Sequence, residues 1–103
     1  MSIIMLMEWE TVTPAQYEEA RRRVNWEGDV PAGAISHVAA FSESGLRVVD
    51  VWESADEMQA FFDQRLMPVT SQLGIETEPR VEVYPVHALF TPAFGPARKP
   101  AIV

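Results

Sequence analysis

The chain has 103 residues, of which 48% are hydrophobic and 22% are charged, a composition typical of one globular domain. Fifteen acidic residues against eight basic ones give a net charge of −7, which argues against a nucleic-acid partner and against an anionic membrane surface. The absence of cysteine excludes disulfides, thiolate catalysis and thiolate metal sites.

The first predicted element is a strand over residues 2–10, "SIIMLMEWE". Its apolar run is much shorter than the ~20 residues of a membrane span. It also lacks the basic start and the cleavage site of a signal peptide, and acidic residues follow the apolar run at once. We therefore expect a cytoplasmic protein without a membrane partner.

A helix is predicted next, from Thr13 to about Val24. Thr13 suits the cap, Pro14 suits the first helical position, and Gln16 completes a capping box. One side of this helix is apolar, with Tyr17, Ala20 and Val24. A loop that contains glycine and proline follows the helix.

Two strands then flank a short turn, and a second helix follows them. We expect the strands over residues 34–41 and 46–53, joined by "SESG", in which Gly45 supplies a left-handed conformation. "SADE" is a second capping box. The helix that it opens has an apolar stripe of Met58, Phe61, Phe62 and Leu66. Pro68 should kink or interrupt this helix, and Gly74 should close it.

The last predicted strand covers Arg80 to Phe90. Pro85 cannot donate a hydrogen bond to a sheet ladder, so this strand should lie at an edge or carry a bulge. Residues 1–90 would then form the domain. Residues 91–103 contain prolines without periodicity and would form an irregular tail.

The order strand, helix, strand, strand, helix, strand is that of the ferredoxin-like α+β fold, a four-stranded antiparallel sheet with two helices on one face. The strands over 2–10 and 46–53 carry apolar residues on both faces, whereas a half-solvated strand alternates apolar and polar residues. Since the helices cover only one face, we expect a homodimer in which a second copy packs sheet on sheet.

With this element order, the junction Trp52–Ser54 and the pair Phe61–Phe62 that follows it resemble the dimeric α/β-barrel superfamily. Within it, the chain is similar to the antibiotic biosynthesis monooxygenase (ABM) group over residues 2–90. The resemblance implies a dimeric α/β barrel with a pocket for small aromatic molecules between sheet and helices. The group includes oxygenases that use no metal or flavin, haem-degrading enzymes and domains of unknown role. Many members have a histidine where this chain has Phe61, so chemistry that depends on that histidine is not implied here.

The turn of the hairpin decides whether His37 and Asp50 meet. A four-residue loop, Ser42–Gly45, places His37 opposite Asp50 and Ile35 opposite Trp52, with paired Cβ atoms about 4.5–5.5 Å apart. A three-residue loop with a bulge places His37 and Asp50 on opposite faces. In the first register, Asp50 fixes the imidazole tautomer and His37 is a candidate general base. The same contact also suits a buried polar pair that only fixes the register.

Seven further residues are candidates for binding a substrate: Trp9, Trp26, Trp52, Phe62, Arg65, Tyr84 and His87. Core packing or partial exposure is the preferred explanation for the tryptophans, and a solvated helix face for Arg65. No histidine-rich or carboxylate spacing predicts a metal site, and we expect no cofactor.

Three functions are consistent with these patterns. The first is a small-molecule enzyme resembling the cofactor-independent monooxygenases, in which His37, oriented by Asp50, takes a phenolic proton from an aromatic or polyketide-like substrate and the anion reduces dioxygen. The second is a haem-binding or haem-degrading protein with His37 or His87 as iron ligand, which the missing histidine disfavours. The third is a non-catalytic dimeric ligand-binding or accessory domain, in which the polar pair is structural.

Overall fold

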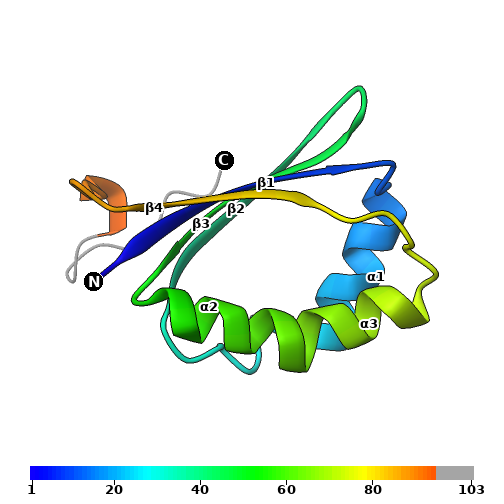
Figure 1. Ribbon diagram of the computed structural model, residues 1–103, viewed down its shortest axis with the longest axis horizontal. Coiled ribbons are helices and arrows are strands. Elements are labelled where there is room, and N and C mark those ends of the chain that lie inside the picture. The colour runs from blue at the N-terminus through cyan, green and yellow to red at the C-terminus, as the bar shows by residue number, and fades with distance from the viewer. Residues whose placement is uncertain (95–103) are drawn as a thin grey trace.

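In the computed structural model, which describes residues 1–94, the regular elements are β1 (Ile3–Glu10), α1 (Pro14–Val24), β2 (Ala34–Ser42), β3 (Gly45–Trp52), α2 (Ala55–Phe61), a π-helical segment (Phe62–Leu66), α3 (Met67–Gln72), β4 (Arg80–Pro85) and a 3-10 turn (Pro92–Phe94). The strands form one antiparallel sheet in the order β2-β3-β1-β4. Helices α1, α2 and α3 lie on the same face of it (Figure 1). The predicted ferredoxin-like α+β fold is confirmed, with β4 at an edge as its proline requires.

The helix α1 begins where the capping box predicts. The Thr13 hydroxyl accepts the Gln16 backbone N–H at 3.1 Å, and Gln16 Oε1 accepts the Thr13 backbone N–H at 2.9 Å. At the start of α2, Ser54 Oγ accepts the Glu57 backbone N–H at 3.2 Å. Only this half of the second capping box is formed, because the Glu57 carboxylate accepts from the Ser54 hydroxyl at 2.9 Å.

Pro68 interrupts the second helix by changing its winding. The segment Phe62–Leu66 widens to a π-helical turn, and Pro68 sits in the first turn of α3. Proline has no backbone N–H to donate, and its ring clashes with the preceding turn of a regular α-helix. A wider turn before Pro68 relieves both conflicts. The helix ends as predicted, because Gly74 adopts a φ of +74° and Ile75 N–H returns to the Thr70 carbonyl at 3.0 Å.

The predicted extent of the last strand is wrong. β4 ends at Pro85 instead of Phe90, because Pro85 pairs with Ile3, the first residue of β1, and the partner strand has no further residues to offer. Within residues 1–94, only Val86 N–H continues the pairing, to the Ser2 carbonyl at 3.0 Å. His87 therefore lies outside the sheet. Of the predicted irregular tail, residues 95–103 lie outside the described part of the chain.

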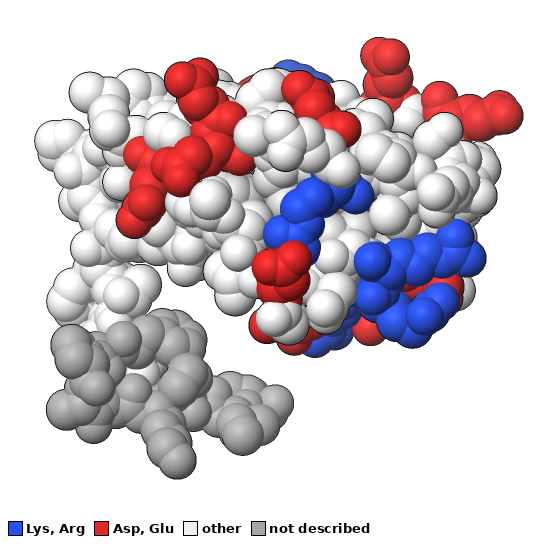
Figure 2. All heavy atoms as spheres, turned by 90° about the horizontal axis from the view of Figure 1, so that it is seen from below, with Lys and Arg blue, Asp and Glu red and all other residues white. Residues whose placement is uncertain are grey.

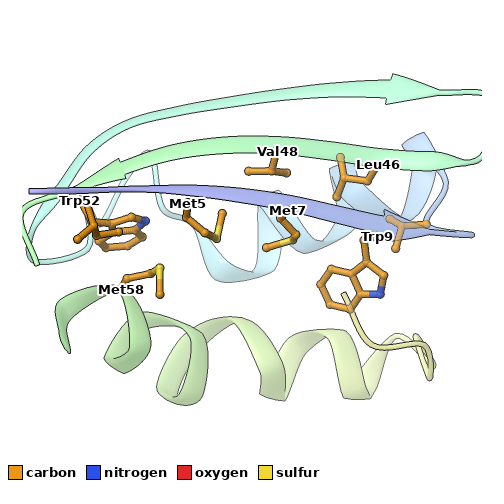
Figure 3. Close-up of a cluster of buried hydrophobic side chains, with 9 residues drawn as sticks. Met5, Met7, Trp9, Leu46, Val48, Trp52 and Met58 are labelled. Carbon is orange, nitrogen blue, oxygen red and sulfur yellow. The ribbon is translucent and has the colours of Figure 1, made fainter. Parts of the chain in front are cut away.

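The core lies between the sheet and the helices (Figure 3). Alternate residues of β1 point toward the helices and are buried, and Met5 is fully inaccessible to solvent. Their neighbours in this cluster include Leu46, Val48, Trp52 and Met58. Burying each such side chain stabilises the fold by about 1.5–3 kcal/mol. This layer fixes β1 and β3, on which the candidate site is built.

The other face of the sheet is apolar and uncovered in the single chain. Leu6 pairs with Val49, which pairs with Val38, and these side chains are 36%, 39% and 60% exposed. A row of exposed apolar side chains across three strands is typical of an interaction surface. Among residues 1–94, no helix has the length and the apolar character that crossing a membrane requires.

Candidate active site

The hairpin of β2 and β3 places His37 opposite Asp50. This is the register of the first alternative, although the connection is shorter than predicted, because Ser42 pairs with Gly45 and only two residues join the strands. The predicted pairing of Ile35 with Trp52 is wrong. A shift in register at the start of β2 leaves Ile35 as a bulge, so that Ala34 stands opposite Trp52.

Asp50 is a buried acceptor for two donors. Its Oδ1 lies 2.6 Å from Nδ1 of His37, and its Oδ2 accepts the indole N–H of Trp52 at 3.2 Å. The Asp50 side chain is 7% exposed, whereas that of His37 is 34% exposed. Because a carboxylate only accepts, Nδ1 of His37 carries the hydrogen, and the lone pair of the neutral imidazole lies on Nε2.

The hydroxyl of Tyr17 is hydrogen-bonded to Nε2 of His37. Its Oη lies 2.8 Å from Nε2 of His37, and the two ring planes are within 3° of each other. Trp26 lies 5.3 Å from the imidazole and 5.9 Å from the phenol ring, measured between centroids. Burial raises the pKa of Tyr17, so the phenol stays protonated near neutral pH and donates to Nε2.

Tyr17 is the residue of this site that the sequence analysis missed. Its helical spacing with Ala20 predicted an inward-facing side chain, and this was the available signal. Its contact with His37 depends on how α1 crosses β2, which no pattern in either segment specifies. The sequence therefore offers the pair His37–Asp50 as one of two alternatives, and gives no sign of the third member of the chain of hydrogen bonds.

A cavity of about 310 Å³ lies between the helix-facing side of the sheet and the helices. This volume is at the lower end of the ~300–1,000 Å³ typical of small-molecule sites. Its apolar wall includes Met7, Val48, Phe61, Phe62 and Leu66. Its polar lining in the described chain consists of Gln16, Tyr17, Glu27, Ser36, His37 and Asp50. The arrangement suits a largely apolar molecule that presents one polar group to the Tyr17–His37 pair.

Six of the predicted site residues line this cavity: His37, Asp50, Trp9, Trp26, Trp52 and Phe62. Trp9 is also part of the core, 3% exposed, and donates its indole N–H to the Thr77 carbonyl at 2.9 Å. Phe61 stands where the family resemblance places a histidine, and its ring lies 5.4 Å from that of Trp52. That part of the cavity is consequently apolar.

Arg65, Tyr84 and His87 do not line the cavity. The Arg65 guanidinium donates to the backbone carbonyls of Val24 and Asp29, at 2.9 and 2.8 Å, and so ties the end of α1 to the second helix. Tyr84 lies on the open sheet face and donates to a neighbouring glutamate at 3.0 Å. His87 is exposed beyond the end of β4. Among the described residues, no cluster of histidines and carboxylates is placed to hold a metal ion.

The positive charge of α1 is balanced locally. Figure 2 shows the helical side of the molecule, where blue and red groups lie next to one another. Ion pairs join the three arginines of this helix to Glu18, Glu19 and Glu27. Hydrogen bonds from Arg22 and Arg23 lower the pKa of Glu19 to about 2. These exposed pairs contribute little to stability and do not point a cation into the cavity.

No family model matches the sequence, and no curated protein sequence matches it significantly. Solved structures do match the fold. A Nitrosomonas europaea protein with the provisional name antibiotic biosynthesis monooxygenase is 8% identical, with a TM-score of 0.64 over 84% of this chain and 90% of that one. SnoaB, a cofactor-independent oxygenase from Streptomyces nogalater, is 14% identical, with a TM-score of 0.58 over 85% and 93%.

A dimeric ferredoxin-like protein of unknown function from Thermobifida fusca is 13% identical, with a TM-score of 0.60 over 84% of this chain and 92% of that one. At such identities, likeness shows the fold alone. The resemblance to ABM-like proteins is therefore confirmed as a likeness of fold.

Proposed function

We propose that the protein is a small-molecule enzyme that oxidises an aromatic or polyketide-like substrate with dioxygen and without a cofactor. One observation carries the proposal: an apolar cavity of about 310 Å³ is lined by the hydrogen-bonded chain Tyr17–His37–Asp50, whose imidazole is a suitable proton acceptor. The fold shared with SnoaB supports the reaction class. The mostly apolar wall supports an aromatic substrate.

The reaction balances without a cofactor when the substrate contains an activated methylene group, as an anthrone does. The site takes the phenolic proton of the enol form, and the resulting anion passes an electron to dioxygen. The two radicals combine through a new C–O bond, and the peroxide anion takes the proton back. Loss of one water converts the former methylene into a carbonyl. All the electrons that dioxygen accepts come from the substrate, so no external reductant is consumed.

We further propose that two copies pack through their open sheet faces. Leu6, Val38 and Val49 leave apolar area exposed in the single chain. A two-fold dimer buries the same patch of both copies at once. The dimeric Thermobifida fusca protein of the same fold supports this assembly.

A non-catalytic ligand-binding or accessory domain is the second candidate. The observation that favours it is the completeness of the polar network: among the described residues, no buried side-chain nitrogen or oxygen lacks a hydrogen-bond partner. In this case the cavity binds an aromatic molecule, and His37 serves only to fix the register of the hairpin. For the haem alternative, the geometry offers no support, since Nε2 of His37 is bonded to Tyr17 and His87 lies outside the cavity.

The test is dioxygen uptake by protein treated with a metal chelator, with a panel of anthrones and hydroquinones as substrates. We expect uptake by the wild type and a fall of about 10²–10⁴-fold in rate for His37→Ala, the usual contribution of a placed base. His87→Ala is the matched control, because it removes the other histidine from an exposed position. If the folded His37→Ala variant binds the same molecules as the wild type, and neither protein consumes dioxygen, the protein is a non-catalytic binding domain.

A further inference from the structure

In this structure, the imidazole nitrogen that would accept the substrate's proton, Nε2 of His37, already takes part in a hydrogen bond. Nε2 of His37 lies 2.8 Å from Tyr17 Oη, and Nδ1 is engaged by Asp50 at 2.6 Å. A substrate hydroxyl in the cavity therefore reaches the imidazole only by breaking the hydrogen bond from Tyr17. The phenol oxygen of Tyr17 can still accept a hydrogen bond, because a hydroxyl that donates one proton keeps its lone pairs.

Tyr17 is also held in place by its neighbours. Its ring lies 5.9 Å from Trp26 and 6.0 Å from Phe41, the latter edge-on, and its hydroxyl is aimed at His37. Arrangements of this kind are favourable contacts between aromatic rings. A side chain fixed on two sides keeps its oxygen in position while a ligand enters or leaves.

Tyr17 and His37, together with Trp26 and Glu27, line two cavities. Tyr17 and His37 line the inner apolar cavity, and both line a second pocket on the surface, with Glu18, Arg21 and Glu27 around it. A proton that moves from Tyr17 to His37 therefore arrives at a group in contact with a charged, outward-facing pocket. There, water can exchange it.

We propose that Tyr17 is the group that touches the substrate hydroxyl and relays its proton to His37. This inference rests on the proposed small-molecule activity and names the residue through which the base acts. The substrate O–H bond breaks as a proton joins Tyr17 Oη, and the original Tyr17 proton moves to Nε2 of His37. The electron pair stays on the substrate oxygen. Tyr17 ends as a neutral phenol, and the imidazolium is stabilised by Asp50.

The relay does not require Tyr17 to ionise beforehand. Burial raises the pKa of this phenol, with the carboxylates of Glu18, Asp50 and Glu27 acting in the same direction and the Arg21 guanidinium opposing them. A resting tyrosinate is therefore disfavoured. If one proton moves from the substrate to Tyr17 while the other moves along the existing hydrogen bond from Tyr17 to His37, no tyrosinate is formed.

The experiment uses 4-nitrophenol as a probe, because its phenol and phenolate forms differ in absorbance. The fraction of bound probe that is ionised is measured at neutral pH in the intact protein, with affinity measured in parallel. For Tyr17→Phe, we expect the ratio of bound phenolate to bound phenol to fall about 10- to 100-fold, the loss expected for one charge-assisted hydrogen bond. Affinity for the neutral phenol should fall less, by about 2- to 10-fold, the usual loss for one neutral hydrogen bond.

Tyr84→Phe is the matched control, since it makes the same substitution on the opposite sheet face, and it should ionise the probe as the wild type does. A second variant, His37→Gln, keeps hydrogen-bonding groups but removes the base, and should lose ionisation as Tyr17→Phe does. Undiminished ionisation in Tyr17→Phe would overturn the relay, because His37 would then take the proton directly. A wild type that ionises bound probe no more than buffer does would also overturn it.

These outcomes are separable from those of the oxygenase proposal. A wild type that ionises the probe through Tyr17 but consumes no dioxygen with any anthrone contradicts the oxygenase and supports the relay. A wild type that oxidises an anthrone no faster than its Tyr17→Phe variant contradicts the relay and supports the oxygenase.

Discussion

Trp52 donates its indole N–H to Oδ2 of Asp50 at 3.2 Å, the carboxylate oxygen that His37 does not use. The two donors approach different oxygens of one buried carboxylate. Trp52 therefore limits how the carboxylate can rotate, and the carboxylate in turn orients the imidazole. Trp52, which the sequence analysis treated as core or pocket lining, thus also helps to orient the candidate base His37 through Asp50.

Replacing Trp52 by Phe should lower both stability and proton transfer. The change leaves Oδ2 of Asp50 buried without a donor, at a cost of about 1–3 kcal/mol beyond the lost packing. Trp9→Phe is the comparison, because Trp9 and Trp52 are both 3% exposed. The hydrogen bond from Trp9 to Thr77 is only partly buried, so its loss should cost less. Urea unfolding should show Trp52→Phe to be the less stable variant. Equal free energies of unfolding would mean that the Trp52–Asp50 hydrogen bond contributes nothing specific.

The phenol of Tyr17 should titrate late. The chain has two tyrosines, so a Tyr84→Phe background leaves Tyr17 as the only one. Burial raises the pKa of Tyr17 above its usual 10.0, and the tyrosinate absorbance of the folded protein should therefore rise at higher pH than that of the denatured chain. The neutral phenol is the form favoured by folding. Its contribution to stability is thus complete below pH 10.0 and is lost as the pH rises through the folded-state pKa. Earlier ionisation in the folded state would contradict this assignment.

The hairpin illustrates what the sequence predicts and what it leaves open. The two apolar runs and Gly45 between them predict two strands and a turn, but "SESG" is compatible with more than one loop length. The observed pairing of Ser42 with Gly45 selects the register that joins His37 to Asp50. The bulge at Ile35 follows from how the chain enters the sheet after the loop, which no local pattern encodes.

Elements with strong local signals were predicted well, and those set by partners were not. Capping residues fixed the starts of both helices, since these signals act within one turn. β4 is shorter than its apolar pattern suggests, because β1 begins at Ile3 and offers no partner beyond it. The contact of Tyr17 with His37 joins residues of two elements, and only tertiary packing brings them together.

Gly45 should be much less tolerant of alanine than Gly74. Both have positive φ, +145° and +74°, but a Cβ at Gly45 would lie 2.5 Å from the Trp9 carbonyl oxygen, whereas a Cβ at Gly74 meets nothing within 4 Å. Gly74→Ala should cost about 1–2 kcal/mol for the left-handed backbone alone. Gly45→Ala should cost clearly more in thermal or urea unfolding, because β1 must move. If the two variants are equally stable, β1 does not approach the hairpin as closely as the structure shows.

The open sheet face should determine the oligomeric state. Val49→Glu places a charge in the middle of this face, so a sheet-on-sheet dimer would bury two uncompensated carboxylates and should dissociate. Val30→Glu is the matched control, since Val30 is 66% exposed in the loop after α1, away from that face. Light scattering should give the mass of a dimer for the wild type and the control, and of a monomer for Val49→Glu. A monomeric wild type would contradict the proposed assembly.

The proposed oxidation is tested most directly by following the oxygen atoms themselves. Chelator-treated protein is supplied with an anthrone under isotopically labelled dioxygen, and the product is analysed by mass spectrometry. We predict one labelled atom in the new carbonyl group and one in water, with one dioxygen consumed for each product formed. An unlabelled carbonyl, or a rate of product formation that His37→Ala leaves unchanged, would contradict the account.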